Sequence, residues 1–435
     1  MYRKYMRSAS PINPFLSNLQ IQIYLNRKDL QNEFNIETIN GLERFRQWCR
    51  NHGTKEYKIN KYFFEEDLTE YKILILKSKN SLTGHSMHSQ NLENKTKKIF
   101  STKSVDINLS LNFNAYENFG VRPIKQLPKV SVFSFNPYEL TRLNQMSKLF
   151  FETKEKKILH FGWEIECSNW EDFASLQYID EIITVSDFSK SAFLPKYDEK
   201  IHVVSPIDSD SLKGSNRVLS KKLKNFGLRN KTYYLNVSDT LSCLDRKGIL
   251  DLIKVYSNLP IVNKKLVLKI SSFTGNGLIQ KKIMSKVTKN KNIILITETL
   301  TETEMESLIS NSYAYLSPHK SEGFGISLFQ SIVLGVPVLA TKYSGNMEYM
   351  KGYDKLLIAY DKKNISKIAL EVYRKTGAQW AYVKKKDFKE KIRDLDQNYQ
   401  GYLEATLECR DLILANYNYK INLNILKSVF EKILR

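Results

Sequence analysis

Residues 321–325 read Ser-Glu-Gly-Phe-Gly and combine a carboxylate, Glu322, with two glycines. Residues 313–316 form an apolar run short enough for a buried strand, and an amphipathic helix is predicted from Ile326 onward, with Gly335 just past its end. Glycines let the backbone approach a ligand closely, and the first N–H groups of a helix have no partner within it. The stretch therefore predicts a site for a phosphate or a sugar oxygen, with Glu322 at its edge.

A second group that could do chemistry is the basic pair Arg246 and Lys247, which precedes Gly248. The pair lies between a predicted strand at residues 232–237 and the helix after it, where a doubly wound sheet receives phosphate. Arginine offers a planar fork and lysine a mobile point charge, so together they can balance the roughly two charges of a diphosphate. The pair predicts a diphosphate site, and the alternative is a solvated surface loop.

Predicted strands alternate with helical stretches along the chain, which is typical of parallel sheets. Such sheets bind ligands at the carboxyl ends of their strands, where the residues above are found. The first set of predicted strands comprises residues 106–112, 130–136, 157–163, 181–185 and 201–205. The second set comprises residues 232–237, 266–270, 293–296, 313–316, 336–340 and 356–359. Thr301 and Glu304 predict a capping box that opens one of the intervening helices.

At 435 residues the chain exceeds the size at which a single core usually keeps growing, so several domains are expected. A helical extension is predicted at 1–78, because residues 40–43 form an N-cap motif before an amphipathic stretch. Residues 79–104 are predicted to be a polar linker, because they are rich in Ser, Asn and Lys and lack periodicity. Rossmann-like domains are predicted at 105–228 and 229–395, and a helical segment at 396–435. Helices are predicted at 387–413 and 422–434, so the first of them begins before the domain boundary.

The formal net charge of +21 indicates an anionic partner or surface, or a lysine-rich composition with no partner implied. No nucleic-acid-binding signature occurs, so no nucleic acid partner is expected. No apolar run approaches the roughly 20 residues of a membrane span, and no signal-peptide core follows the N-terminus. The expected location is the cytoplasm, free or peripheral on the cytoplasmic face of the membrane. The four cysteines lie far apart, so neither a zinc site nor a disulfide framework is expected.

The block from Ser321 through Gly-Val-Pro-Val-Leu-Ala-Thr at 335–341 to Ser344-Gly345-Asn346 resembles the donor-site signature of retaining glycosyltransferases of family four, in group 1. The resemblance implies the GT-B fold: two Rossmann-like α/β domains with a parallel sheet each, and C-terminal helices that cross back to the first domain. It also implies that Glu322 contacts hydroxyls of the donor sugar. The donor-binding residues that it implies are Arg246, Lys247, Gly323, Phe324, Gly325, Gln330, Ser344, Gly345 and Asn346.

Two positions depart from the family pattern. Gln330 stands where the family usually has a second glutamate that holds the ribose, and Ser238 stands where some members have an arginine. Glutamine still accepts a hydrogen bond but lacks the charge that strengthens it, so a weaker grip on the nucleotide is expected.

The run from His160 to Glu164 and residues 180–188 resemble segments of capsule and lipopolysaccharide enzymes of the same family. Some members have an active-site histidine after the equivalent strand, which makes His160 a candidate catalytic residue; the alternative is a satisfied core histidine. Glu164, near the predicted strand end, is a candidate acceptor-site residue or a solvated carboxylate. Residues 114–122 stand where the family has its acceptor loop but keep only one glycine.

The resemblance implies transfer of a sugar, with retained configuration, from a nucleotide diphosphate sugar to a cell-surface polysaccharide or a lipid-linked glycan. Catalytic roles are expected for Glu322, Glu164 and His160. No cofactor is expected. No metal is expected either, because no Asp-x-Asp metal motif stands at the end of a predicted strand; Asp208-Ser209-Asp210 has that spacing but follows a proline and is interpreted as a turn. The alternative is a non-catalytic GT-B scaffold or binding subunit of a polysaccharide assembly.

Overall fold

The structure is a computed structural model of the 435-residue chain. It describes residues 66–78, 84–107, 124–137, 154–167, 174–193, 197–212, 218–240, 243–260, 263–366 and 376–435, with the single positions 32, 33, 44, 48, 139, 140, 143, 369 and 373. Of the helix predicted after residue 40, only Arg44 and Trp48 are described, and both are helical; the loop at 114–122 lies outside the described residues.

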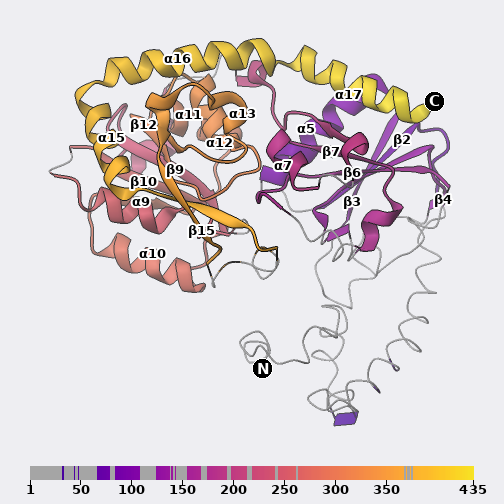
Figure 1. The fold of residues 1–435 in the computed structure, drawn as a ribbon, viewed down its shortest axis with the longest axis horizontal. Helices are drawn as coiled ribbons and strands as arrows, with labels where there is room; N and C mark the ends of the chain where they lie inside the picture. Colours follow the sequence, from indigo (N-terminus) through magenta and orange to yellow (C-terminus); the bar gives the residue numbers. More distant parts are fainter. Residues whose placement is uncertain are drawn as a thin grey trace. The chain divides into compact units, whose positions relative to one another are not determined.

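One six-stranded sheet has the order β11-β10-β9-β12-β13-β14, with parallel pairing throughout. Its strands are β9 (Tyr233–Asp239), β10 (Lys265–Ser271), β11 (Ile293–Ile296), β12 (Ala314–Ser317), β13 (Val338–Thr341) and β14 (Leu357–Ile358). Helices cover both faces: α9 (Ile249–Tyr256) and α10 (Leu278–Thr288) lie on one, and α11 (Glu302–Ser310), α12 (Ile326–Val333) and α13 (Met347–Met350) on the other (Figure 1). Because both faces are covered, the strands are apolar runs rather than alternating ones.

A second six-stranded sheet has the order β3-β2-β5-β6-β7-β8. Its strands are β2 (Ile73–Ser78), β3 (Thr102–Ile107), β5 (Val130–Ser134), β6 (Lys156–His160), β7 (Glu181–Thr184) and β8 (Ile201–Val203). Helix α5 (Gly84–Ile99) connects β2 to β3, and α7 (Asp187–Ser191) connects β7 to β8. The described pairs are parallel, which is the arrangement that βαβ units produce.

Three long helices end the chain: α15 (Lys385–Gln397) packs on α9, α16 (Tyr399–Asn416) on α12, and α17 (Tyr419–Leu434) on α5. The remaining elements are short: β1 (Glu66–Asp67) with β4 (Ile124–Gln126), the hairpin of β15 (Tyr360–Asn364) and β16 (Gln379–Val383), α8 (Lys221–Asn225), and the 3₁₀ turns η6 (Ala174–Tyr178), η7 (Asp198–Lys200), η8 (Ser209–Leu212) and η10 (Asp354–Leu356). None of the helices in the described ranges is long and apolar enough to cross a membrane.

The chain divides into two compact units. One comprises residues 1–80, 100–159 and 173–180, and the other comprises residues 81–99, 160–172 and 181–435. The side-chain contacts of His88, His160, Arg246 and Glu322 all lie within the second unit. The domain boundaries expected at residues 228 and 395 remain predictions.

The predicted polar linker at 79–104 is wrong, because α5 and the start of β3 occupy it; the predicted extension also ends too late, because β2 lies inside it. Helix α5 escaped detection because it buries polar side chains. Lys95 is only 1% exposed and lies 2.8 Å from Asp208, while Thr96 and His88 are also buried. A helix whose buried face is polar shows no apolar periodicity, and its ion pair is formed only in the tertiary structure.

The other predicted strands agree with the structure to within a few residues, except that the strand expected at 106–112 begins earlier, at Thr102. The capping box of Thr301 and Glu304 is confirmed, as is Gly335 directly after the C-cap of α12. The single helix expected at 387–413 is wrong. It is interrupted at Asn398, whose side chain accepts a hydrogen bond from the Gly401 N–H and so begins α16.

Gly248 permits the close approach of two loops at the carboxyl ends of β9 and β12. Its φ is +69°, and a Cβ there would lie 1.9 Å from the carbonyl oxygen of Pro318. We expect Gly248→Ala to lower the free energy of unfolding by about 3 kcal/mol or more, since it adds a backbone clash to left-handed strain. Gly275→Ala is the matched control, because Gly275 has φ +73° and a Cβ there would meet nothing within 4 Å. Equal losses in urea denaturation would contradict the role of the Pro318 contact.

Candidate active site

The order of the β9-containing sheet changes direction between β9 and β12, since β10 and β11 lie on one side and β13 and β14 on the other. Ligands of doubly wound sheets bind at the carboxyl ends of the strands at this switch point. Arg246 and Lys247 follow β9, and Glu322 follows β12. The two motifs that the sequence predicted separately are therefore neighbours in space.

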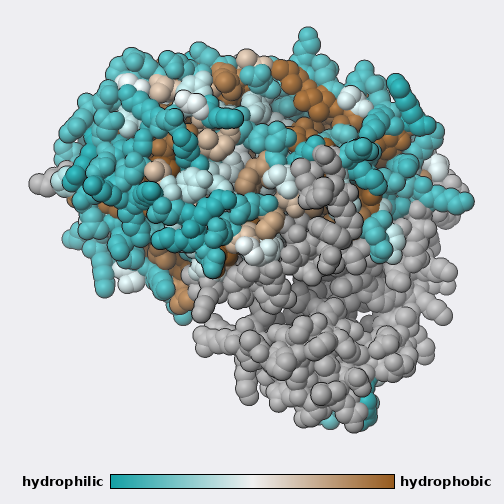
Figure 2. Space-filling view, viewed as in Figure 1, coloured by the Kyte–Doolittle hydropathy of each residue, from teal (hydrophilic) through white to brown (hydrophobic). Residues whose placement is uncertain are grey.

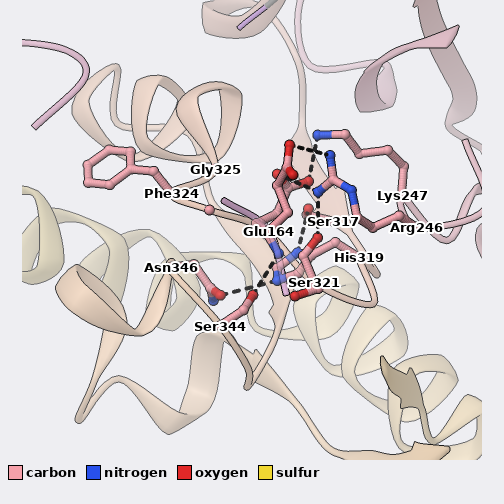
Figure 3. A network of polar contacts seen from close by, with 12 residues as sticks. Glu164, Arg246, Lys247, Ser317, His319, Ser321, Phe324, Gly325, Ser344 and Asn346 are labelled. Carbon is pink, nitrogen blue, oxygen red and sulfur yellow. Dashed lines mark hydrogen bonds and ion pairs between the residues drawn. The ribbon is translucent and has the colours of Figure 1, made fainter. Parts of the chain in front are cut away.

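These three side chains and Glu164 form one network, in which Figure 3 labels Arg246, Lys247 and Glu164. The Lys247 Nζ lies 2.5 Å from Glu322 Oε1, and the Arg246 Nη1 lies 3.2 Å from Glu322 Oε2. The Arg246 Nη2 lies 3.5 Å from Glu164 Oε1. The Arg246 Nη1 also donates to the carbonyl of Ser321, at 2.6 Å. Two cations and two carboxylates thus compensate each other.

The two cations differ in how deeply they are buried. The Arg246 side chain is 1% exposed, whereas that of Lys247 is 20% exposed. Burial alone would raise the pKa of Glu322, but the charges of Lys247 and Arg246 outweigh it and lower the pKa to about 2. Burial likewise opposes the charge of Arg246, but Glu322 and Glu164 raise its pKa above the ordinary value. Glu322 is therefore a carboxylate at any pH at which the protein would work.

The depressed pKa of Glu322 makes a pH-dependent contribution to stability. The ionised carboxylate stabilises the fold above its ordinary pKa of 4.5, and this contribution is lost as the pH falls through about 2. We expect a loss on the order of 3 kcal/mol over this window, which Glu322→Gln should not show. Urea midpoints measured across the window for both proteins check this, and parallel pH profiles would contradict it.

Ser344 and Gly345 hold the backbone of Glu322. The Glu322 N–H donates to Ser344 Oγ at 2.8 Å, and the Gly345 N–H donates to the Glu322 carbonyl at 2.9 Å. A Cβ on Gly345 would lie 2.0 Å from the carbonyl oxygen of Gly323, so the two loops approach closely only because this residue is glycine. Asn346, fully buried, donates to the carbonyl of Thr341 at 3.0 Å. In this structure these polar groups position the Glu322 loop.

His319 is a site residue that the sequence analysis missed. It is fully buried, with Nδ1 3.0 Å from Ser317 Oγ and Nε2 3.1 Å from both the Tyr343 carbonyl and Asn346 Oδ1. A carbonyl only accepts, so Nε2 carries the proton and Nδ1 accepts from Ser317. Burial lowers the pKa of His319, which favours the neutral ring. Its place between Pro318 and Glu322 was the available signal.

Lys320 was missed as well. Its Nζ lies 2.7 Å from Asp245 Oδ1 and 4.4 Å from the ring centroid of Tyr382, and the whole residue is 4% exposed. The Lys320 N–H also donates to the Arg246 carbonyl, at 2.7 Å. Lys320 therefore holds the loop that carries Arg246 and Lys247 in position.

The glycine turn begins α12, with Gly325 as its N-cap residue at φ +85°. Phe324 does not offer its ring to a ligand. The ring is buried against Phe329 and Tyr349, with centroids 5.3 and 5.2 Å away, and points away from the charged network (Figure 3). Phe324 can contribute only backbone groups to a donor site. Gln330 lies on the second turn of α12 and is partly exposed.

Glu164 belongs to the network and His160 does not. The Glu164 side chain is 28% exposed and also accepts a hydrogen bond from the Tyr373 hydroxyl at 3.0 Å. His160 is 1% exposed, and its Nε2 lies 2.6 Å from the Nε2 of His88 on α5. This geometry favours the core-histidine alternative for His160. A catalytic role for it stays a prediction without geometric support.

The Asp208-Ser209-Asp210 segment is used for structure. Asp208 pairs with Lys95 and accepts from Asn422 Nδ2 at 2.7 Å, while Asp210 accepts from the Tyr419 N–H at 3.1 Å. These carboxylates join α5, η8 and α17. Elsewhere, too, the part of the chain that the structure describes contains no group of three or more metal-binding side chains.

Comparison with known proteins shows what parts of the chain are similar to. Residues 224–390 match the family described as glycosyl transferases group 1. A "Glycosyltransferase 1 domain-containing protein 1" from Xenopus tropicalis is 26% identical over 137 residues, which are 31% of this chain and 39% of that protein. The match thus spans well under half the length of that curated relative.

Two solved structures share the fold. The Anabaena protein Alr3699/HepE in complex with UDP-glucose has a TM-score of 0.59 and 13% identity, covering 83% of this chain and 99% of that chain. A glycosyltransferase from Rickettsia africae ESF-5 has a TM-score of 0.59 and 13% identity, covering 86% and 100%. With the two parallel six-stranded sheets, these likenesses establish the GT-B fold. Within that fold, residues 224–390 are the part of the chain that is similar to group 1 glycosyl transferases.

Proposed function

We propose that the protein transfers a sugar from a nucleotide diphosphate sugar to a polysaccharide or lipid-linked glycan in cell-surface polysaccharide biosynthesis, with retained anomeric configuration. One observation carries the proposal: Lys247, Arg246 and Glu322 meet at the switch point of a doubly wound sheet, and α12 begins four residues after Glu322. Cations and free helix N–H groups suit a diphosphate, and a buried carboxylate suits sugar hydroxyls.

The two cations have different roles in this proposal. Lys247 is partly exposed on a flexible stem, so it can exchange the Glu322 carboxylate for a donor phosphate. Arg246 is buried and donates a hydrogen bond to the Ser321 carbonyl, so its ion pair keeps Glu322 in place. With Lys247 on the phosphate, Glu322 is free to accept hydrogen bonds from the sugar.

The difficult event is departure of the diphosphate while positive charge grows on the sugar. Lys247 and the N-terminal N–H groups of α12 would stabilise the leaving charge without a divalent metal. Glu322, ionised and fixed, would orient the sugar and favour its developing positive charge. The donor-motif resemblance supports the retained configuration, and these cations support the metal independence.

Nucleotide release from UDP-, GDP- and TDP-sugars tests the function. UDP-glucose is the first donor to try, because the Anabaena protein was solved with it. We expect slow hydrolysis of one donor, unchanged by a chelator, and a product whose anomeric configuration matches the donor by NMR. Lys247→Met should weaken nucleoside diphosphate binding by about tenfold or more, whereas Lys342→Met, which removes another ion-paired lysine, should not.

A non-catalytic GT-B scaffold is the second candidate. Glu322 and Glu164 already compensate the two cations, and Gln330 replaces the expected ribose-binding glutamate. Absence of nucleotide release from every donor, together with nucleotide binding that Glu322→Ala leaves unchanged, would favour the scaffold.

The expected location is the cytoplasm, where donor nucleotides are made. The net charge of +21 supports contact with an anionic membrane surface, where lipid-linked acceptors would be found.

A further inference from the structure

Helix α10 presents an outward face made of lysines. Lys281, Lys282 and Lys286 are exposed, and so are the C-cap residue Lys289 and, beyond it, Lys291. The opposite face is anchored by Ile283, which is 0% exposed. The spacing of three, four and seven residues places the lysines around one side of the helix. None of the five has an ion-pair partner among the residues described.

No acidic residue offsets this charge along the chain. Between residues 252 and 297 the sequence contains nine lysines and no aspartate or glutamate. Other lysine-rich surfaces differ: α15 interleaves its lysines with acidic residues, and Lys384 pairs with Asp361. Residues 252–297 thus have a local net charge of +9, to which α10 and the two lysines after it contribute five charges.

Apolar side chains stand among these lysines. Leu278 is 58% exposed and Met284 is 38% exposed, and both belong to α10. Figure 2 shows the region of α9 and α10 as mainly hydrophilic, with hydrophobic residues among the hydrophilic ones. Exposed leucine and methionine within a lysine cluster are typical of helices that lie in a membrane interface.

We propose that the outward face of α10 docks the protein on an anionic phospholipid surface. The lysine ammonium groups would contact the lipid phosphates while Leu278 and Met284 enter the acyl boundary. Nucleic acid suits this face less well, because residues 278–291 contain neither arginine nor an aromatic residue for base contacts. The docking deepens the proposed membrane contact by naming the surface that makes it, and it does not depend on the sugar transfer, because none of these residues belongs to the Glu322 network.

Vesicle co-sedimentation of the full chain tests the docking, with vesicles of phosphatidylcholine and phosphatidylglycerol in equal parts and of phosphatidylcholine alone. The test variant is Lys281→Gln/Lys282→Gln/Lys286→Gln. The matched control is Lys342→Gln/Lys384→Gln/Lys427→Gln, which removes the same charge from exposed, ion-paired lysines. A second test variant, Leu278→Ser/Met284→Ser, keeps the charge. A labelled RNA of arbitrary sequence serves as the competing partner.

The wild type should bind the anionic vesicles and not the neutral ones. The α10 lysine variant should bind at least about tenfold more weakly, since each lysine at an anionic surface contributes about fivefold. The Leu278→Ser/Met284→Ser variant should also bind more weakly, and the control should lose much less. Nucleotide release in solution should be unchanged in all variants, and vesicle binding is decisive even if no donor is turned over.

Three results would overturn the docking: equal binding to both vesicle types, equal losses in the α10 and control triples, or tighter binding to RNA that ignores Leu278→Ser/Met284→Ser.

Discussion

Glu322→Gln is expected to lower nucleotide release from the donor by about 10²–10³-fold. The carboxylate is 8% exposed and ionised, and it faces the place where the sugar would sit beside Lys247. Glutamine keeps the shape but removes the charge that would stabilise a cation-like sugar. The uncharged side chain also releases Lys247, so nucleoside diphosphate affinity should be retained or increased.

Turnover and binding must therefore be measured together, by nucleotide release and by calorimetry with the nucleoside diphosphate. Glu298→Gln is the control, because Glu298 is 56% exposed and lies 4.0 Å from Lys222. If Glu322→Gln keeps turnover within a few-fold of the wild type, Glu322 has no catalytic role. If it loses nucleotide binding as well, the proposed division between Lys247 and Glu322 is wrong.

Arg246→Met is expected to lower the free energy of unfolding by about 3–5 kcal/mol. The guanidinium is 1% exposed and compensates Glu322 and Glu164, so its removal takes away the cation that the two carboxylates share. It also removes the hydrogen bond to the Ser321 carbonyl. Urea denaturation measures the loss, and Arg410→Met, which removes an arginine 29% exposed beside Asp411, is the control.

The double variant Arg246→Met/Glu322→Gln keeps the prediction testable even if Arg246→Met alone fails to fold. Removing both partners of a buried pair costs less than removing one, so the double variant should recover part of the stability lost by Arg246→Met. Strictly additive losses, or an effect of Arg246→Met no larger than that of Arg410→Met, would show that Arg246 does not support Glu322.

Local patterns accounted for most of the strands and for the types of site residue. Residues 293–296 were predicted as a strand with the bounds that β11 has, because a short apolar run suits a strand buried on both faces. The capping box at Thr301 and the glycine turn before α12 are short-range features, so they too could be predicted from neighbouring residues.

Helix α5 could not be predicted in this way. Its buried face includes His88 and Lys95, which belong in a core only because His160 and Asp208 meet them from distant parts of the chain. The same holds for Phe324. Its neighbours suggested a ligand site, but the aromatic residues of α12 and α13 take its ring into the core.

The sequence by itself determined that this chain has a carboxylate before a glycine turn and a basic pair after a strand, because those features are local. Only the tertiary structure decided that the two motifs form one network, that Arg246 is sealed while Lys247 remains accessible, and that His319 and Lys320 hold the loops around them. The physical reason is that burial and charge pairing depend on which distant segments meet, and strand order sets those meetings.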